Sequence, residues 1–315
     1  MNINKSQVLK VCKKLKRDLI SYKFLAAGAH NLNYLLNTKQ GKLVLKIDNS
    51  AQRVYLKREY LFLSLLKEPL GPEVYLFDSS KKIISRDFLV EEFIEGEHPK
   101  KDTDEFIKAM AKWYKRLHSY RFKRFPFYIK RSKYYSMKES YWYHCLKEYQ
   151  KFKHVASKNI REQIDPLYVK TSKIIKNNEN LFKKRKYTII CQGDPCPSNL
   201  FYKNGKVRAI DWEFAKFNLE EWDITFFVWI HDLNKRQEKL FLKTYGYPNT
   251  AIKKKQYDII HLLNGLSMIS WRLERLDLIN KKKISRKNNT SRKKDIMRGW
   301  REDIPKVKKM LDLWK

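Results

Sequence analysis

Glycine and proline are scarce in this sequence, with 9 of each among 315 residues. The chain also contains no internal repeat and no low-complexity tract. These features exclude a collagen-like or largely disordered protein, because such chains are rich in these residues or in simple repeats. Since 43% of the residues are hydrophobic and 14% are aromatic, the chain can bury one large core or two lobes that share a cleft.

Cysteines and long hydrophobic runs are also few. The four cysteines, Cys12, Cys145, Cys191 and Cys196, have no CxxC spacing, so we expect reduced thiols rather than disulfides or a zinc site. No hydrophobic run approaches the about 18 residues that a membrane span needs. The sequence begins with an amphipathic, lysine-rich helical pattern that lacks the apolar centre of a signal peptide. We therefore expect a cytoplasmic protein without a membrane span.

Positive charge is abundant instead: 69 lysines and arginines against 34 aspartates and glutamates give a net charge of +35. This balance is compatible with nucleic acid as a partner, because clustered basic side chains release counterions from a phosphate backbone. The lysines are spread along the whole chain, however, and we favour an ordinary solvated surface. The densest basic block, Asn280–Lys294, is the best place for a polyanion contact, and its alternative interpretation is an exposed loop between helices.

The first hundred residues show a strand-rich pattern. Alternating apolar positions predict two or three strands over Phe24–Asp48, with a hairpin turn near Gln40–Gly41. A helical pattern follows at Ala51–Lys67, and an apolar strand lies within Asp87–Pro99. This part of the chain therefore predicts a small lobe built on a β-ribbon.

The remainder of the chain is mostly helical. Helical patterns occupy Asp104–Tyr120, Tyr141–Val155, Asp165–Lys184 and most of the sequence after Glu220. The clear strands of this part lie in Ile189–Asn218. We therefore expect an α+β fold with two lobes, a β-rich lobe at residues 1–96 and a larger, mostly helical lobe at residues 97–315.

Two aspartates and an asparagine interrupt the apolar segment Ile189–Asn218. A two-residue turn at Asn204–Gly205 would place Asn199 beside Asp211 at the open end of a hairpin. The loop before the hairpin contains two prolines and a glycine, and it can curl Asp194 toward the same point. Two carboxylates and a carboxamide are too few for a closed calcium cage, but they suit a Mg²⁺ ion that shares the phosphate oxygens of a nucleotide.

The spacing D-x4-N followed by x11-D resembles the catalytic loop and metal-binding aspartate of the aminoglycoside phosphotransferase and choline kinase superfamily. The matching strings are "QGDPCPSNLF" and "AIDWEFAKFNLEEWDI", and the second is more similar to choline and ethanolamine kinases. Further similarities at "GAHNLNYLL", "KLVLKI", "WYKRLH" and "HLLNGLSMISW" cover most of the chain. The resemblance implies a two-lobed, protein-kinase-like fold and ATP-dependent phosphoryl transfer.

The resemblance implies roles in phosphoryl transfer for five polar residues. Asp194 would orient the acceptor hydroxyl and accept its proton late, while Asn199 and Asp211 would hold Mg²⁺ on the phosphates. Lys46 would contact the α- and β-phosphates and pair with a carboxylate from the next helix, for which Glu59 is best placed. The alternatives are ordinary turn aspartates, a solvated edge lysine and a surface glutamate.

Further nucleotide contacts are implied on both sides of the lysine strand, and the nucleotide is ATP or GTP. The residues expected to cover the phosphates are Gly28, Ala29 and Asn31. The residues whose backbone groups are expected to pair with the base are Glu92, Phe93 and Ile94. Two other polar residues receive structural interpretations: Asp223 is expected to hydrogen-bond the catalytic-loop backbone, and His118 is expected to be a packed histidine.

This sequence departs from the family pattern at two places. The usual histidine two residues before the catalytic aspartate is Gln192, which still offers an amide donor and acceptor. The two tryptophans that wall the quaternary ammonium in choline kinases are replaced by Asn264 and Ser267. Because each cation–π face contributes about 0.5–2 kcal/mol, we expect choline to bind weakly and a hydroxylated primary amine or a sugar to be preferred.

Acidic side chains near the active-site hairpin indicate a cationic or hydroxyl-rich acceptor. The residues expected to line its pocket are Glu213, Phe214, Glu220, Trp229, Asn264, Ser267 and Trp271. Core packing is the alternative for the aromatic members of this set. We thus expect an ATP-dependent kinase that phosphorylates a hydroxyl group of an amine- or polyol-type acceptor. The alternative is a catalytically weak, kinase-like protein that binds nucleic acid through its basic surface.

Overall fold

A computed structural model describes residues 3–28, 30–49, 54–123, 126, 137–182, 187–281 and 293–314. Contacts between residues divide the chain into two compact units. Unit 1 consists of Met1–Ser132, Ile189–Phe217 and Leu233–Gly246, and unit 2 consists of Lys133–Thr188, Asn218–Asp232 and Tyr247–Lys315. The predicted division into lobes near residue 96 stays a prediction.

The amino-terminal part of unit 1 is a five-stranded antiparallel sheet with the strand order β1-β2-β3-β5-β4. Its strands are β1 (Leu19–Ala27), β2 (Asn31–Thr38), β3 (Gly41–Asp48), β4 (Val74–Asp78) and β5 (Phe88–Glu92). The predicted β-ribbon therefore consists of three strands, and the expected turn near Gln40 lies between β2 and β3. The short strand β4 lacks the alternation of a half-buried strand, so the sequence pattern does not predict it.

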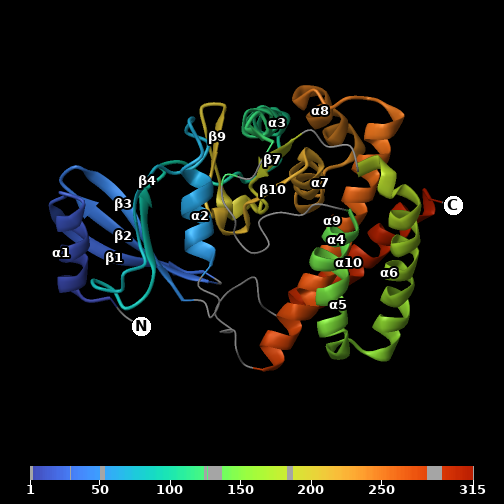
Figure 1. Ribbon diagram of the computed structural model, residues 1–315, viewed down its shortest axis with the longest axis horizontal. Helices are drawn as coiled ribbons and strands as arrows, with labels where there is room; N and C mark the ends of the chain where they lie inside the picture. Colours follow the sequence, from blue (N-terminus) through green and yellow to red (C-terminus); the bar gives the residue numbers. More distant parts are fainter. Residues whose placement is uncertain are drawn as a thin grey trace. The chain divides into compact units, whose positions relative to one another are not determined.

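The two faces of this sheet differ because successive side chains on a strand point to opposite faces. On one face, the core includes Leu45 of β3 and Val8 of the helix α1 (Lys5–Lys14). Lys46, the next residue of β3, points to the other face, where α2 (Tyr55–Leu63) lies. Figure 1 shows α1 and α2 on opposite sides of the sheet. A polar site can therefore form beneath α2 while apolar side chains fill the space beneath α1.

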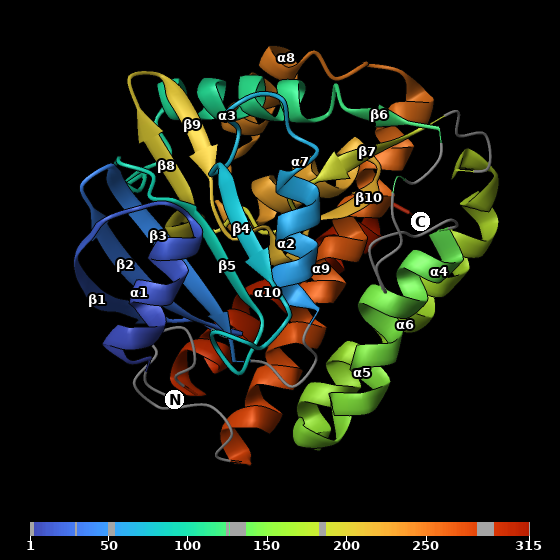
Figure 2. The ribbon, with the colours of Figure 1, turned by 60° about the vertical axis from the view of Figure 1, so that its left-hand side comes forward.

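The rest of unit 1 consists of a small sheet, a hairpin and two helices. These elements are α3 (Asp104–Leu117), β6 (Arg121–Phe122), β7 (Thr188–Cys191), β8 (Leu200–Lys203), β9 (Lys206–Ala209), β10 (Lys216–Asn218) and α8 (Lys235–Tyr245). The first residue of β7 and the last residue of β10 belong to unit 2. The small sheet has the order β10-β7-β6, and β8 pairs with β9 (Figure 2). Two 3-10 turns, Pro197–Asn199 and Trp212–Phe214, flank the hairpin. The strand β6 lies outside Ile189–Asn218, the segment predicted to hold the later strands. The sequence does not predict β6, because two residues are too few to show the alternation of a strand.

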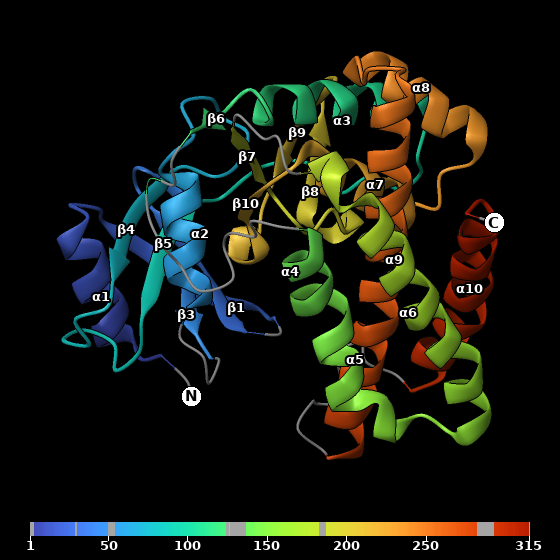
Figure 3. The same cartoon turned by 45° about the vertical axis from the view of Figure 1, so that its right-hand side comes forward.

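Unit 2 is helical. Its elements are α4 (Met137–Tyr141), a π-helical turn (Trp142–Leu146), α5 (Lys147–Phe152), a 3-10 turn (Lys153–Val155), α6 (Lys158–Asn178), a second 3-10 turn (Glu179–Phe182), α7 (Glu220–Ile230), α9 (Ala251–Asn280) and α10 (Lys293–Asp312). Figure 3 shows the long helix α9 among α5, α6 and α10. Because neighbouring helices surround it, α9 buries side chains along most of its length, including Leu262, Leu266 and Leu273.

These elements confirm the predicted α+β class, with a β-rich amino-terminal part followed by a mostly helical part. None of the helices in the described ranges combines the length and the hydrophobicity needed to cross a lipid bilayer. Most of the basic block, residues 282–292, lies outside the described residues. A polyanion contact at this block therefore stays a prediction.

Gly71 lies where Leu63 of α2 meets the Trp212 ring. A Cβ atom on Gly71 would stand 2.7 Å from Leu63 Cδ2 and 2.8 Å from Trp212 Nε1. We predict that Gly71→Ala lowers the free energy of unfolding by about 1–3 kcal/mol, because both buried side chains must move. Gly28→Ala is the control, since its Cβ would stand 3.6 Å from the Asn31 carbonyl oxygen, an ordinary contact. Equal losses for both variants in denaturant unfolding would contradict the packing argument.

Candidate active site

The β8–β9 hairpin brings Asn199 next to Asp211. Its turn residues, Asn204 and Gly205, have φ angles of 51° and 72°, the positive values that a type I′ turn requires. Beyond the paired strands, the backbone N–H of Ile210 donates to the carbonyl oxygen of Asn199 at 2.8 Å. The predicted hairpin register is confirmed, and Asn199 and Asp211 lie together at its open end.

The loop before the hairpin turns Asp194 toward Asn199. Gly193 has a φ angle of +84°, and a Cβ atom there would stand 2.6 Å from the Phe214 carbonyl oxygen, so this close approach requires glycine. The Asn199 Nδ2 donates to the Asp194 carboxylate at 2.9 Å, and the Cys196 thiol also hydrogen-bonds this carboxylate. Desolvation raises the pKa of Asp194 to about 6, while the bonds from Cys196 and Asn199 oppose this rise. The carboxylate is therefore mostly ionised at neutral pH.

Gln192 hydrogen-bonds both the loop that carries Asp194 and the segment that carries Asp211. Its Oε1 accepts a hydrogen bond from the backbone N–H of Asp194 at 2.8 Å. Its Nε2 donates to the carbonyl oxygens of Ile210 at 3.3 Å and Asp211 at 3.2 Å. The glutamine that replaces the family's histidine thus uses both its donor and its acceptor to hold the site.

Lys46 is buried in a cluster of carboxylates. Its Nζ donates to Glu59 Oε1 on α2 at 2.7 Å, and it lies 3.7 Å from both Glu91 Oε1 and Asp211 Oδ1. Burial disfavours the ammonium form, but attraction to the three carboxylates outweighs it and raises the pKa of Lys46 well above its usual value. The pair of Lys46 and Glu59 that the sequence predicts is present, and its nucleotide-binding role stays a prediction.

Asp211 adopts a backbone conformation that few residues with a side chain occupy. Its φ and ψ angles are 62° and 66°, in the left-handed region, where strain is on the order of 1–3 kcal/mol. The next backbone N–H, of Trp212, donates to Glu59 Oε1 at 3.1 Å and helps to fix this conformation. The buried Oδ1 of Asp211 finds no hydrogen-bond donor among the residues that the structure describes. A strained backbone and an unsatisfied oxygen together indicate a functional carboxylate.

Glu91 belongs to this cluster, although the sequence analysis did not single it out. It lies on β5, and alternation along the strand sends its side chain to the Lys46 face while Glu92 points elsewhere. Desolvation raises the pKa of Glu91 to about 8, against the opposing attraction of Lys46. Glu92 instead binds Arg208 through two hydrogen bonds of 2.6 and 2.5 Å. The pairing of β5 with β3 places Leu89 opposite Lys46. Glu91 lies two residues after Leu89, so its side chain is on the same face of the sheet as Lys46.

The residues expected to cover the phosphates lie between β1 and β2. The backbone N–H of Gly28 donates to the carbonyl oxygen of Asn31 at 2.8 Å, which closes a tight turn. Ala29 lies outside the described residues. Asn31 is buried, and its Nδ2 donates to Glu213 Oε2 at 3.1 Å. Contacts of these residues with a nucleotide stay a prediction.

The backbone expected to pair with the base follows β5. The N–H of Glu92 donates to the carbonyl oxygen of Glu73 at 2.8 Å, and that of Phe93 donates to the carbonyl oxygen of Lys42 at 3.4 Å. The Ile94 side chain is buried. Two of the three expected donors thus have protein partners, and pairing of this segment with a base stays a prediction.

Two residues expected to bind the acceptor lie in unit 1. Both oxygens of the buried Glu213 carboxylate have partners, His30 Nδ1 at 2.7 Å and Asn31 Nδ2 at 3.1 Å. Phe214 is 39% exposed, and its ring lies 6.0 Å from those of His30 and Tyr55 in edge-on geometry. Glu213 is thus bound to the segment that begins β2, whereas Phe214 offers an accessible aromatic surface.

The other expected acceptor residues lie in unit 2. The buried Asn264 donates from Nδ2 to the Trp222 carbonyl oxygen at 3.0 Å and to Thr225 Oγ1 at 2.8 Å, so its amide joins α9 to α7. The remaining members are Glu220, which pairs with Lys253 at 2.7 Å, the buried Trp229 packed on Gly265, the half-buried Ser267, and Trp271, whose ring lies 5.3 Å from the Arg275 guanidinium. An acceptor role for this set stays a prediction.

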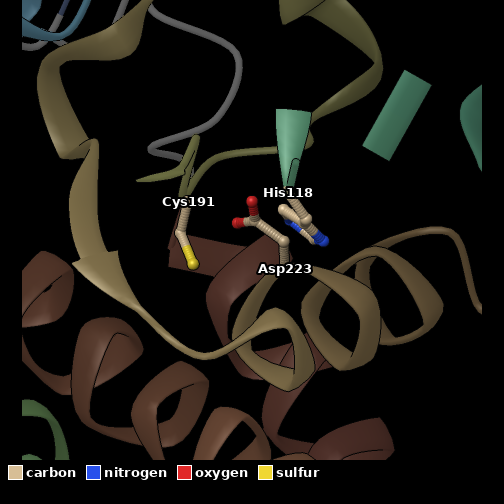
Figure 4. A group of neighbouring side chains, drawn as sticks. All are labelled: His118, Cys191 and Asp223. Carbon is tan, nitrogen blue, oxygen red and sulfur yellow. The ribbon is translucent and has the colours of Figure 1, made fainter. Parts of the chain in front are cut away.

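The interpretation of His118 as a packed histidine is confirmed. Its ring is buried just after α3, and its Nδ1 shares a 2.9 Å hydrogen bond with the hydroxyl of Tyr245 on α8. Figure 4 shows this ring and the buried Cys191 at the end of β7. Asp223 on α7, drawn in the same figure, is fully buried, and its expected bond to the backbone of the loop that carries Asp194 stays a prediction.

Comparison of the sequence with protein families gives one match over most of the chain. A model described as the phosphotransferase enzyme family matches residues 21–253. No curated protein sequence matches at a significant level. The matched range includes β3, the loop that carries Asp194 and the β8–β9 hairpin.

Solved structures with a similar fold include kinases of small molecules. A choline kinase from Streptococcus pneumoniae has 18% sequence identity and a TM-score of 0.64, with 96% of each chain covered. A choline kinase from Cryptosporidium parvum has 13% identity and a TM-score of 0.67, covering 98% of this chain and 95% of that chain. A spectinomycin phosphotransferase in complex with ADP and spectinomycin has 16% identity and a TM-score of 0.64, covering 98% and 99%. At these identities the similarity shows a shared fold.

Glu91 generates a prediction about stability and pH. Its pKa is about 8 in the folded protein and near 4.5 when unperturbed, so folding favours its protonated form. This contribution is complete below about pH 4.5 and is lost as the pH rises through about 8. We predict that Glu91→Gln becomes more stable relative to the wild type as the pH rises from about 5 to about 9. Chemical unfolding of both nucleotide-free proteins at several pH values measures this difference, and a difference that does not change with pH would contradict the assignment.

Proposed function

The chain belongs to the phosphotransferase enzyme family, and from this premise we propose that it is an ATP-dependent kinase of a small molecule. The proposed reaction moves the γ-phosphoryl group of ATP, or GTP, onto a hydroxyl group of an amine- or polyol-type acceptor. The observation that carries the proposal is the convergence of four side chains in unit 1. Asn199 donates to Asp194 at 2.9 Å, and Lys46 lies 3.7 Å from Asp211.

In this proposal, Lys46 binds the nucleotide phosphates. Its raised pKa keeps the ammonium charged, and Glu59 fixes its position at 2.7 Å. A fixed charge acts strongly on phosphate oxygens where protein atoms exclude water. Glu59 also accepts the backbone N–H of Trp212, so one carboxylate holds both the lysine and the turn that follows Asp211.

The residues present also fit a Mg²⁺ ion. Asp211 Oδ1 is buried and, in the part of the chain that the structure describes, accepts no hydrogen bond. Even with Glu91 mostly protonated at neutral pH, the carboxyl groups of Glu59 and Asp211 flank a single ammonium, so a cation beside Asp211 would offset negative charge in the cluster. Asp211 and the carboxamide oxygen of Asn199 would hold the ion, and these are the hard oxygen ligands that Mg²⁺ prefers. An ion held there would supply positive charge to the phosphates during transfer.

Asp194 would act on the acceptor. Its carboxylate is ionised at neutral pH and is held in place by Asn199 and the Cys196 thiol. A carboxylate so placed orients an incoming hydroxyl group and accepts its proton as the new P–O bond forms. Gln192 supports this position through the Asp194 backbone.

The acceptor class is inferred from the similar solved structures and from the positions at which this chain differs from choline kinases. The similar structures include choline kinases and a spectinomycin phosphotransferase, and both named acceptors combine hydroxyl groups with cationic nitrogen. The absence of tryptophans at Asn264 and Ser267 argues against an aromatic cage for a quaternary ammonium. A primary or secondary amine with hydroxyl groups, or a sugar, is therefore the proposed acceptor.

A substitution of Asp194 tests this function. Hydroxylated amines, sugars, aminoglycosides and choline are screened with the wild type for acceptor-dependent release of ADP. For any acceptor found, Asp194→Asn is predicted to lower turnover by about 10²–10⁴-fold. The Kd for the nucleotide is predicted to stay unchanged, because Asp194 acts on the acceptor rather than on ATP.

Asp104→Asn is the matched control for this experiment. Asp104 is an aspartate of the same unit, at the start of α3, and its carboxylate pairs with Arg236 on α8 at 2.7 Å. This variant is expected to keep full turnover. Wild-type turnover in a folded Asp194→Asn protein would rule out the assignment, and the lack of any acceptor-dependent ADP release by the wild type would contradict the proposed function.

A further inference from the structure

Glu213 joins two segments of unit 1 that are far apart in the sequence. It lies in the turn Trp212–Phe214, and the residue is only 4% exposed. One carboxylate oxygen shares a 2.7 Å hydrogen bond with His30 Nδ1, and the other accepts from Asn31 Nδ2 at 3.1 Å. Both oxygens are therefore engaged by the segment that begins β2. A buried carboxylate is stable only with such partners.

Helix α2 contacts both Glu213 and His30. The guanidinium Nη1 of Arg58 donates to the backbone carbonyl oxygen of Glu213 at 3.0 Å. The Tyr55 ring stacks on the His30 ring, with centroids 3.8 Å apart and planes 17° apart. The loop before β2, the turn after Asp211 and the helix that carries Glu59 are thus fixed to one another around Glu213.

The backbone on either side transmits this attachment to the residues proposed to act on the nucleotide. The N–H of Asn49, just after β3, donates to the His30 carbonyl oxygen at 2.7 Å. Asp211 precedes Glu213 by two residues in the same tight turn and has the left-handed conformation. One side chain, that of Glu213, therefore links the segment that begins β2 to the turn that follows Asp211.

We propose that Glu213 is a positioning residue for the nucleotide. Its hydrogen bonds to His30 and Asn31, together called the clasp, hold the segment expected to cover the phosphates in a fixed position relative to the Asp211 carboxylate. This inference rests on the proposed function and changes one of its expectations, since it assigns the buried Glu213 carboxylate to His30 and Asn31 rather than to the acceptor. Loss of the clasp lets the loop and the turn move independently. The affinity for the nucleotide then falls, while the affinity for the acceptor is unchanged.

The kinetic test uses Glu213→Ala, Glu213→Gln, His30→Ala and Asn31→Ala. Asn37→Ala is the control, because Asn37 is an asparagine of the same strand that donates to Ser21 at 2.9 Å, outside the clasp. We expect Glu213→Ala and His30→Ala to raise the KM for the nucleotide by at least about tenfold. The KM for the acceptor is expected to stay at the wild-type value in every variant.

Glu213→Gln provides a conservative rescue. The glutamine amide has the shape of the carboxyl group and can accept from Asn31 while it donates to the other tautomer of His30. We expect its KM for the nucleotide to stay within about threefold of wild type. A rise in the acceptor KM with an unchanged nucleotide KM would overturn the proposal, and so would a glutamine variant as impaired as the alanine variant. Glu213→Ala can fail to fold. His30→Ala removes the same hydrogen bond at a more exposed side chain and therefore tests the proposal in its place.

Hydrogen exchange of the nucleotide-free protein separates failure of the clasp from failure of the proposed function. His30→Ala and Asn31→Ala are expected to speed backbone exchange at residues 30–34 and also at residues 209–214, whereas Asn37→Ala changes only its own strand. This readout needs neither a nucleotide nor an acceptor, so it holds even if the wild type shows no turnover. Faster exchange confined to residues 30–34 would show that the two segments are not coupled and would overturn the inference.

Discussion

One buried ammonium group, that of Lys46, organises unit 1. Burial alone would drive its proton off, yet Glu59, Glu91 and Asp211 surround it and keep it charged. In turn the ammonium offsets the cost of burying the Glu59 carboxylate, whereas burial raises the pKa of Glu91 to about 8 and leaves that side chain mostly protonated at neutral pH. Strand β3, helix α2, strand β5 and the hairpin each supply one member, so the four elements must be in place together for any of the charges to be tolerated.

The sequence predicts those parts of the site that depend on local geometry. The type I′ turn at Asn204–Gly205 fixes the hairpin register, and with it the placement of Asn199 beside Asp211, because the turn residues alone set the pairing. The lysine strand follows from period-two alternation, whereas the pairing of Lys46 with Glu59 is implied by the family resemblance. Spacing within a short segment carries this information.

Contacts between distant segments are not predictable in this way. The sequence alone does not distinguish Glu91 from Glu92. The pairing of β5 with β3 decides which of these two side chains points toward Lys46. The attachment of Glu213 to His30 joins residues 183 positions apart in the sequence. The resemblance assigns Asn264 to a ligand-lining position, yet its amide donates to the Trp222 carbonyl oxygen and to Thr225 Oγ1 and so joins α9 to α7.

The central claim is that Asp211 holds the metal of a nucleotide complex beside Lys46. Calorimetric titration of the wild type and of Asp211→Asn with ATP, with and without Mg²⁺, tests it most directly, since asparagine tolerates the left-handed backbone of this position. The account predicts that Mg²⁺ strengthens ATP binding to the wild type and that this gain is lost in the variant. The same gain from Mg²⁺ in both proteins would contradict the claim.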